Sequence, residues 1–447
     1  MYMFHGALVS FAERRVICMK KLVIAAVLLL LGGAWYSAVG NYVKKPQEYE
    51  RLIKSAEEME AKEIYYDAIL NYQAALEYKP GNLSLNYKIA EDYKKLGEDE
   101  KYEQIMNEVI SGSMENESIV LELADYYLEN GDKTNAIALL KEQKNRTGSE
   151  ALGAKLQTLA GSYTTFGQSY DFISDPCSGF MKVEMDGQQG LTDSQGNVVI
   201  WPQYEKIGVF GTGGFAPVKT ETSAYFIDQN NYKRRVPDEE YEELGIANQG
   251  VIPVKQNGKW GYLDTNLKPL TDFIYDAATP VVNSLAAVNQ DGKWALIDEK
   301  LNQVTEFEFE DVILDDWGFC SWNGVAFVKK KDGYRLVGSD GTQKGTNVFE
   351  AARAFASKEP AAVMLDGKWG FVSDEGEIVQ ECRYEAAGSF SEIGYAPVQM
   401  DGAWGYIKEN GDWVIEPQFD EAKCFNEKGL APVMSNGAWS FIQLDVF

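Results

Sequence analysis

From about Tyr170 to its C-terminus, the chain repeats one short pattern about every 35 residues. The pattern is clearest as Ala396-Pro397-Val398, then Asp401-Gly402, then Trp404-Gly405-Tyr406. Asp-Gly and Asn-Gly pairs favour tight hairpin turns, because both central residues of such a turn adopt positive φ. Each unit therefore predicts a two-stranded β-hairpin. The array as a whole predicts a surface for binding or scaffolding rather than a single catalytic cleft.

Eight units are found when the sequence is aligned on the valine that precedes each turn. Successive spacings are 35, 36, 34, 40, 35, 35 and 35 residues. The valines are Val183, Val218, Val254, Val288, Val328, Val363, Val398 and Val433. Five units carry a tryptophan six residues beyond the valine, at Trp260, Trp294, Trp369, Trp404 and Trp439. Such regular spacing predicts one structural unit per repeat.

An aromatic residue followed by an acid is the second landmark of each unit. The acids are Asp171, Glu205, Glu242, Asp276, Glu310, Glu350, Glu385 and Asp420. The array begins with such a strand, around Tyr170, and ends with a hairpin around Trp439. Its ends are thus complementary halves of one unit, as closure of a ring requires. We expect an all-β domain that resembles an eight-bladed β-propeller, with an open β-solenoid as the alternative.

A Trp-Gly pair recurs at this slot, as Trp260-Gly261, Trp369-Gly370 and Trp404-Gly405. This sequence resembles the WG-repeat (KWG-type) family of bacterial proteins. Trp294-Ala295 and Trp439-Ser440 depart from the pattern, and the second and fifth units lack it. The resemblance implies a β-rich repeat domain and brings no catalytic residues with it.

The preceding segment, residues 44–165, is rich in helix-forming residues and repeats every 34 residues. It resembles the tetratricopeptide repeat family, in which small and large side chains alternate where paired helices pack. The matching positions are Ala56, Met59, Ala68, Tyr72 and Ala75, then Ala90, Tyr93, Tyr102, Met106 and Val109, then Ala124, Tyr127, Ala136, Leu140 and Gln143. The resemblance implies an α-helical solenoid that binds a peptide or acts as a spacer.

Residues 22–40 form an uncharged, mostly apolar run that is long enough to span a bilayer. Positive charge is heavier before the run than after it, which favours a cytoplasmic N-terminus and an extracytoplasmic remainder. We therefore expect a cytoplasmic tail and single-pass signal anchor over 1–43, helical repeats over 44–165 and the β domain over 166–447. The alternative is a secretion signal that starts at Met19 and is cleaved near Gly40.

Composition excludes several functions. Lys and Arg total 42 against 68 Asp and Glu, and this net charge of −26 argues against nucleic acid as a partner. His5 is the only histidine, so the rest of the chain lacks the usual neutral-pH base and metal ligand. The five cysteines show no Cys-x-x-Cys spacing. We predict no enzyme activity, and we assign no catalytic, cofactor-binding or metal-binding residue and no cofactor.

The eight acids of the second landmark are the candidate binding residues. In a closed ring they would come to equivalent places and form an acidic collar for cations or basic peptides. The structural alternative is that each acid accepts hydrogen bonds from backbone groups or from an indole. The repeated tryptophans pose the same choice between exposed stacking surfaces and a buried core between blades.

These observations predict a membrane-anchored protein of the bacterial cell envelope that binds protein partners, with a glycan as a further ligand class. One alternative is a carboxylate-dependent, glycan-active enzyme, and another is a purely architectural subunit of an envelope complex. An enzyme would bring two or more acids that lie off the repeat phase together in a deep pocket. A binding module would show equivalent surface features in successive repeats.

Overall fold

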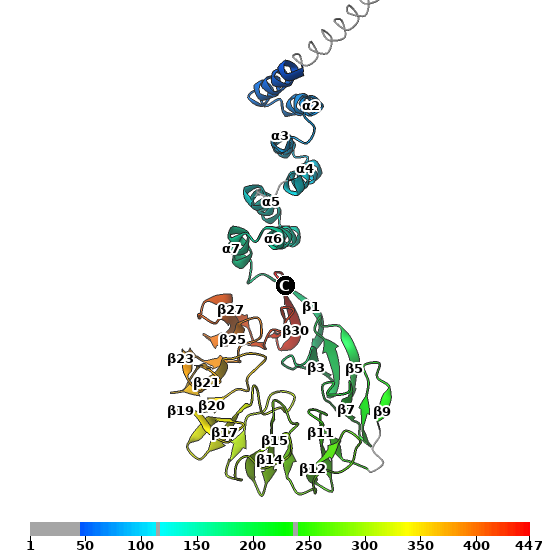
Figure 1. Ribbon diagram of the computed structural model, residues 1–447, viewed down its shortest axis with the longest axis vertical. Coiled ribbons are helices and arrows are strands. Elements are labelled where there is room, and N and C mark those ends of the chain that lie inside the picture. The colour runs from blue at the N-terminus through cyan, green and yellow to red at the C-terminus, as the bar shows by residue number, and fades with distance from the viewer. Residues whose placement is uncertain (1–44, 113–116, 236–239) are drawn as a thin grey trace, which may run out of the picture. The chain divides into compact units, whose positions relative to one another are not determined.

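The computed structural model describes residues 45–112, 117–235 and 240–447 (Figure 1). The described chain divides into two compact units, the first ending at Lys155 and the second beginning at Leu156. The apolar run over residues 22–40 that predicts a membrane anchor lies outside the described residues. Among the helices that are described, none has the length and hydropathy that a membrane span needs.

The first unit is helical. Residues 45–60 form its first helix. The helices that follow are α2 (Tyr65–Leu76), α3 (Leu83–Lys95), α4 (Asp99–Gly112), α5 (Glu117–Glu129), α6 (Lys133–Thr147) and α7 (Glu150–Thr158). Side chains satisfy backbone donors where two helices begin: Asn82 Oδ1 accepts from the Ser84 N–H at 3.1 Å, and Asp132 Oδ1 accepts from the Asn135 N–H at 3.1 Å. Local capping thus fixes where these two helices start.

Burial in the helical unit follows the 34-residue repeat of the sequence. Thirteen of the fifteen repeat positions are buried, and Met59 and Tyr93 are partly buried. Gln143 is buried with its Oε1 atom unpaired, although an apolar residue would fit the pattern there. Small residues such as Ala68 and Ala75, both fully buried, let paired helices approach closely.

The second unit folds into eight antiparallel sheets, which we number as blades in chain order. Each blade opens with an inner strand of two residues. Blades 1 to 4 are β2 (Phe172–Ile173), β3 (Phe180–Met185), β4 (Gln188–Asp193) and β5 (Val198–Tyr204); β6 (Lys206–Ile207), β7 (Ala216–Lys219), β8 (Ala224–Ile227) and β9 (Lys233–Arg235); β10 (Glu243–Leu244), β11 (Val251–Gln256) and β12 (Lys259–Asp264); and β13 (Ala277–Ala278), β14 (Leu285–Gln290) and β15 (Lys293–Asp298).

The remaining blades follow the same plan. Blades 5 to 8 are β16 (Asp311–Val312), β17 (Val325–Lys330), β18 (Gly333–Gly338) and β19 (Gln343–Phe349); β20 (Ala351–Ala352), β21 (Ala361–Leu365), β22 (Lys368–Val372) and β23 (Ile378–Tyr384); β24 (Ala386–Ala387), β25 (Tyr395–Met400), β26 (Ala403–Lys408) and β27 (Trp413–Phe419); and β28 (Glu421–Ala422), β29 (Leu430–Ser435) and β30 (Ala438–Leu444) with β1 (Tyr163–Tyr170). The fold is an eight-bladed β-propeller.

Strands from the two ends of the propeller sequence close the ring. β1 pairs antiparallel with β30, from Tyr163 opposite Leu444 to Tyr170 opposite Trp439 (Figure 1). Phe441 lies in the middle of this contact, with ring centroids 6.0 Å from Phe166 and 6.2 Å from Tyr170. The expected closure is confirmed, and the open solenoid is wrong.

The hairpin turns adopt the conformation that their sequences predict. In six blades an Asp or Asn with φ between 49° and 54° precedes a Gly with φ between 70° and 78°. Both values lie in the left-handed region, where these residues carry the smallest steric cost. The Asp332-Gly333 turn of blade 5 differs, because Gly333 has a φ of 138°.

Blades 3 and 4 have three strands because a side chain interrupts the outer ladder. The Thr271 hydroxyl accepts the Tyr262 N–H at 2.9 Å, and the Thr305 hydroxyl accepts the Leu296 N–H at 2.9 Å. In each blade a backbone N–H thus donates to a threonine hydroxyl and is not available to a carbonyl group of a fourth strand. The outer segments keep only isolated bridges, such as Trp260 with Tyr275 and Trp294 with Phe309.

Truncating the side chain at the closing contact tests how far ring closure stabilises the propeller. Because Phe441 is fully buried between β1 and β30, we expect Phe441→Ala to lower the free energy of unfolding by about 3–5 kcal/mol. Denaturant titration followed by tryptophan fluorescence measures this change. Trp201→Ala, which removes a side chain that is 55% exposed on β5, should cost less than about 0.5 kcal/mol. Equal losses for the two variants would contradict the prediction.

Candidate functional site

The eight predicted acids are all exposed, and each lies just before or at the start of an inner strand. Six of them accept a backbone N–H from the hairpin turn of their own blade: Asp171 from Asp186 (2.7 Å), Glu242 from Gly258 (2.8 Å), Asp276 from Asp291 (2.8 Å), Glu350 from Gly367 (3.1 Å), Glu385 from Gly402 (2.9 Å) and Asp420 from Gly437 (3.1 Å). Glu205 and Glu310 instead pair with Lys219 and Lys293. Six of the eight acids therefore brace the hairpins, and a collar that binds a ligand stays a prediction.

A separate cavity of about 560 Å³, the axial cavity, lies among the loops that follow the inner strands. Its walls include Asp175 of blade 1, Val282 of blade 4 and Ser389 of blade 7. Contributions from widely separated blades place it at the centre of the ring. None of the eight predicted acids lines it.

One long loop distinguishes blade 5 from the other blades. Residues 313–324 connect β16 to β17, whereas the corresponding loops of the other blades have six to eight residues. This loop accounts for the 40-residue spacing between Val288 and Val328. It carries Asp315, Asp316 and Trp317 into the axial cavity.

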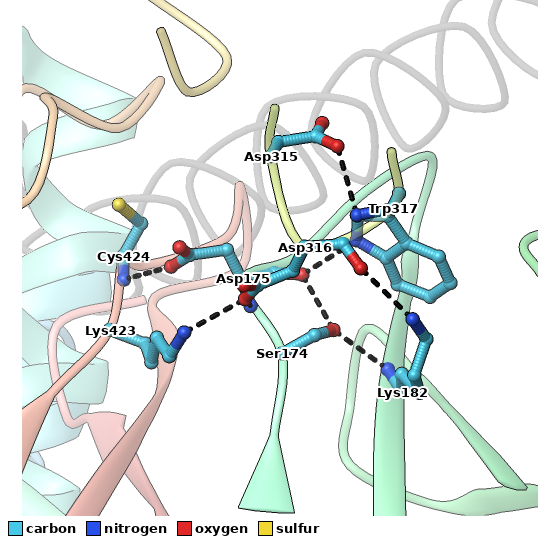
Figure 2. Close-up of polar contacts among 8 residues, drawn as sticks. All are labelled: Ser174, Asp175, Lys182, Asp315, Asp316, Trp317, Lys423 and Cys424. Atoms are coloured by element: carbon cyan, nitrogen blue, oxygen red, sulfur yellow. Dashed lines mark hydrogen bonds and ion pairs between the residues drawn. The ribbon is translucent and has the colours of Figure 1, made fainter. Parts of the chain in front are cut away.

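The tip of this loop bonds to blades 1 and 8 (Figure 2). Asp316 Oδ2 accepts the Asp175 N–H at 2.8 Å and the Lys423 Nζ at 2.8 Å. Trp317 Nε1 also donates a hydrogen bond to the Asp175 carbonyl oxygen at 2.9 Å. Lys182 Nζ donates to the Asp316 carbonyl at 2.9 Å and lies 4.9 Å from the centre of the Trp317 ring. We call these five residues the transannular bridge.

The charges of the bridge balance one another. Burial opposes ionisation of Asp316, but the Lys423 ammonium and the Asp175 N–H outweigh it and hold the pKa of Asp316 below its usual range. Burial likewise works against the charge on Lys423, but Asp175 and Asp316 together raise its pKa. Burial lowers the pKa of Lys182. Two carboxylates and two lysines therefore form a compact, nearly neutral group.

Asp315 stands apart from this balance. Its Oδ1 accepts the N–H groups of Trp317 and Phe319, both at 2.9 Å. Within the described residues it forms no ion pair, and burial raises the pKa of its carboxyl to about 6. Asp316 and Asp175 add to this rise through like-charge repulsion. Asp315 is thus a buried carboxylate of the cavity that forms no direct ion pair, although its charge acts to raise the pKa of Lys182.

Comparison with known families assigns the repeats. The WG containing repeat model matches residues 190–221, 240–260, 260–294, 369–402 and 404–439. The chain is a WG-repeat protein. No curated protein shows significant similarity to it.

Solved structures resemble the WG-repeat protein only remotely. A chain of a eukaryotic initiation factor has a TM-score of 0.41 at 11% identity, covering 64% of this chain and 87% of that one. A chain of the mitotic checkpoint complex has a TM-score of 0.34 at 8% identity, covering 64% of this chain and 94% of that one. An acylaminoacyl peptidase from Pyrococcus horikoshii has a TM-score of 0.34 at 10% identity, covering 54% of this chain and 50% of that one. Similarity at this level carries no conclusion about function.

Close packing explains the glycine of the Trp-Gly pair. A Cβ atom on Gly405 would lie 2.4 Å from the Ile415 carbonyl oxygen, and one on Gly370 would lie 2.7 Å from that of Gln380. The outer strand therefore packs directly against the glycine backbone. Ala295 is tolerated in blade 4, where the outer segment makes only isolated bridges.

The repeated tryptophans serve mainly as packing groups in the WG-repeat domain. Trp439 is buried in the core of the closing blade. Trp294, Trp369 and Trp404 are partly buried and pack against the cores of their own blades or the next one. This arrangement favours the core interpretation over an exposed row of stacking surfaces.

The chemistry of the axial cavity favours binding over nucleophilic attack. Cys177 and Cys424 line the cavity, but burial raises the pKa of Cys177 to about 11 and that of Cys424 well above its usual value. Both thiols therefore stay protonated at neutral pH. The described residues contain no group of acids and cysteines arranged to hold a metal ion.

Sequence reasoning missed the axial cavity because its residues lie far apart in the chain. Asp175 and Asp316 are separated by 141 positions, and Asp175 and Cys424 by 249. A signal was nevertheless present, since one spacing of 40 residues interrupts an otherwise regular series. An insertion that repeat packing does not need marks a loop with another role.

Neutralising the central acid of the transannular bridge should destabilise the WG-repeat domain. Asp316→Asn removes one of the two carboxylates that stabilise the charge on Lys423 and leaves only Asp175. We therefore expect the free energy of unfolding to fall by about 1–3 kcal/mol. Denaturant titration followed by tryptophan fluorescence measures it. Glu409→Gln, which breaks an exposed pair with Lys358, should cost at most about 1 kcal/mol. A bridge variant as stable as this control would refute the prediction.

The raised pKa of Asp315 predicts a pH-dependent difference between the wild type and Asp315→Asn. Because the folded-state pKa lies above the unfolded value of 3.8, stability from the protonated carboxyl is fully present below pH 3.8 and is lost as the pH rises through about 6. At pH 8 the variant should be more stable than the wild type by on the order of 2 kcal/mol. Below pH 3.8 this advantage should vanish. Thermal unfolding at a series of pH values measures both, and a gap that does not change with pH would contradict it.

Proposed function

We propose that this WG-repeat protein is a binding or scaffold protein whose two units present surfaces to protein partners. The observation that carries the proposal is the way the propeller uses its repeated groups. Six of the eight repeated acids brace hairpin turns, and four of the five repeated tryptophans pack in or against blade cores. Such groups stabilise a rigid ring whose exposed turns remain available for contact.

For the helical unit, we propose a short solenoid of the tetratricopeptide type. The 34-residue period, the burial of the small residues and the paired helices support this assignment. Exposed apolar side chains on α2, Tyr66 at 60% and Leu70 at 48%, lie one helical turn apart and offer a contact surface. The unit then either binds a partner peptide or acts as a spacer and assembly element.

For location, we propose that the apolar run at residues 22–40 tethers the protein to a bacterial cell membrane, with both units on the extracytoplasmic side. The length of the run and the positive residues before it support this proposal. The alternative is secretion after cleavage of the signal.

Glycan hydrolysis is the competing function, because Asp175, Asp315 and Asp316 lie off the repeat phase and reach one cavity. A hydrolase of this kind needs one acid to donate a proton and a second carboxylate free to act on the sugar. Asp316 is paired with Lys423, and Asp175 accepts the Cys424 N–H at 2.7 Å. Asp315 accepts two backbone N–H groups, so none of these three acids lacks a hydrogen-bond partner, and this favours binding without catalysis. A purely architectural role remains the third candidate.

Photo-crosslinking tests the proposal. We expect the full-length chain with a photoreactive residue at Tyr66, or at the 40% exposed Leu314 beside the cavity, to cross-link defined proteins in a cell-envelope extract. An excess of unlabelled chain should abolish each cross-link, as specific contact requires. Absence of competable cross-links at both positions would contradict binding. Release of sugars from envelope glycan by the wild type but not by Asp315→Asn would establish the enzyme instead.

A further inference from the structure

Outside the transannular bridge, three charged side chains line the axial cavity without an ion pair among the described residues: Asp315, Arg353 and Glu421. Asp315 is buried in the long loop of blade 5. Arg353, which is exposed, directly follows the inner strand β20 and is the one cation of the three. Among the described residues no carboxylate pairs with Arg353, whose guanidinium carbon lies 5.3 Å from the centre of the Trp369 ring. Asp315 and Arg353 line the same cavity, and within the described chain they form no ion pair with each other.

Comparison with blade 8 shows that the position of Arg353 is suited to contacts at the ring axis. Lys423 follows β28 as Arg353 follows β20, and Lys423 holds Asp316 in the transannular bridge. A cation at this point of a blade can therefore reach an anion in the centre. Lys423 is already paired with Asp316 in the bridge. Among the described residues, the guanidinium of Arg353 donates no hydrogen bond. Arginine is also the side chain best suited to bind a carboxylate through two parallel hydrogen bonds.

The other walls of the cavity supply apolar and polar contacts. Trp322 stacks on Phe355, with ring centroids 5.2 Å apart and an interplanar angle of 15°. Asn248 and Asn283 line the same space, and the side-chain oxygen of Asn248 already accepts the Gln249 N–H. The Oγ atom of Ser321 is buried there and makes no hydrogen bond within the described chain. Amides and hydroxyls of this kind both donate and accept, as the backbone of a peptide requires.

We propose that the axial cavity binds a short peptide with free termini, its ammonium group at Asp315 and its carboxylate at Arg353. A ligand with a single charge would leave one of the two protein groups unpaired, and a neutral sugar would leave both. The volume of about 560 Å³ lies within the range of about 300–1,000 Å³ for small-ligand pockets. Four members of the transannular bridge form part of the cavity wall: Asp175, Asp316, Trp317 and Lys423. This site extends beyond the binding of protein partners, because it takes a small ligand inside the ring.

Capped peptides test the two charge contacts separately. The probes are dialanine and trialanine with free termini, the same peptides with an acetylated N-terminus, and the same peptides with an amidated C-terminus. Isothermal titration with the full-length chain at pH 7.5 measures each affinity. Removing either terminal charge should weaken binding by about tenfold or more, because a hydrogen bond between charged groups contributes about 1.5–3 kcal/mol.

Substitutions then assign each terminus to its residue. Asp315→Asn keeps the oxygen that accepts the two backbone N–H groups, so the loop should stay folded. Asp315→Asn should lower the affinity for the free peptide to that for the acetylated peptide, so that the variant no longer distinguishes the two. Arg353→Gln should lower the affinity for the free peptide to that for the amidated peptide. Arg353→Lys should again bind the free peptide more tightly than the amidated one, though by less than the wild type. Asp186→Asn and Arg383→Gln, which change side chains outside the cavity, should bind like the wild type.

Three outcomes would overturn the proposal. The first is that no free peptide binds to the wild-type chain. The second is that free and capped peptides bind with equal affinity, because the protein would then recognise neither terminal charge of the peptide. The third is that only the C-terminal charge matters, which would make Arg353 an anion site without a role for Asp315. The capture of protein partners, measured by cross-linking, is a separate result, so the two proposals can fail independently.

Discussion

Pairing of β1 with β30 is the contact on which the rest of the propeller depends. It joins residues near the start of the domain to its last residues, from Tyr163 opposite Leu444 to Tyr170 opposite Trp439. Without it, two strands would present unpaired backbone edges, and neighbouring blades would lose one side of their cores. The cost of closing so long a segment grows only slowly with its length. A few buried aromatic contacts around Phe441 are therefore enough to hold the ring closed.

A ring of eight blades also leaves space along its axis, and the long loop of blade 5 fills part of it. The transannular bridge connects this loop to blade 8, which contains the closing contact, and to blade 1, which follows it in the chain. Perimeter and centre are thus held by different chemistry. Hydrogen-bonded strands and aromatic packing close the rim, whereas a matched set of acids and lysines connects opposite sides. Such a set orients its neighbours well, because each charge restricts the position of the next.

Much of the fold could be predicted because it is local and repeated. Asp401-Gly402 and its equivalents predict hairpin turns, and the structure places six of them in the expected conformation. The unpaired strand at Tyr170 and the unpaired hairpin at Trp439 predicted closure, since one completes the other. The axial cavity is not local, because Asp175, Asp316 and Lys423 meet only after the ring forms. In sequence each resembles an ordinary loop residue, and the 40-residue spacing alone distinguishes that loop.

The order of strands in the closing blade has a consequence for synthesis of the chain. β1 leaves the ribosome before any other propeller strand, yet its partner β30 (Ala438–Leu444) is the last strand of the propeller. During translation β1 must therefore wait, with an open edge, until every other propeller strand has been made. A chain that stops early displays that edge permanently and can pair with other unfinished chains. The first propeller strand is thus covered only after the last hairpin has been made.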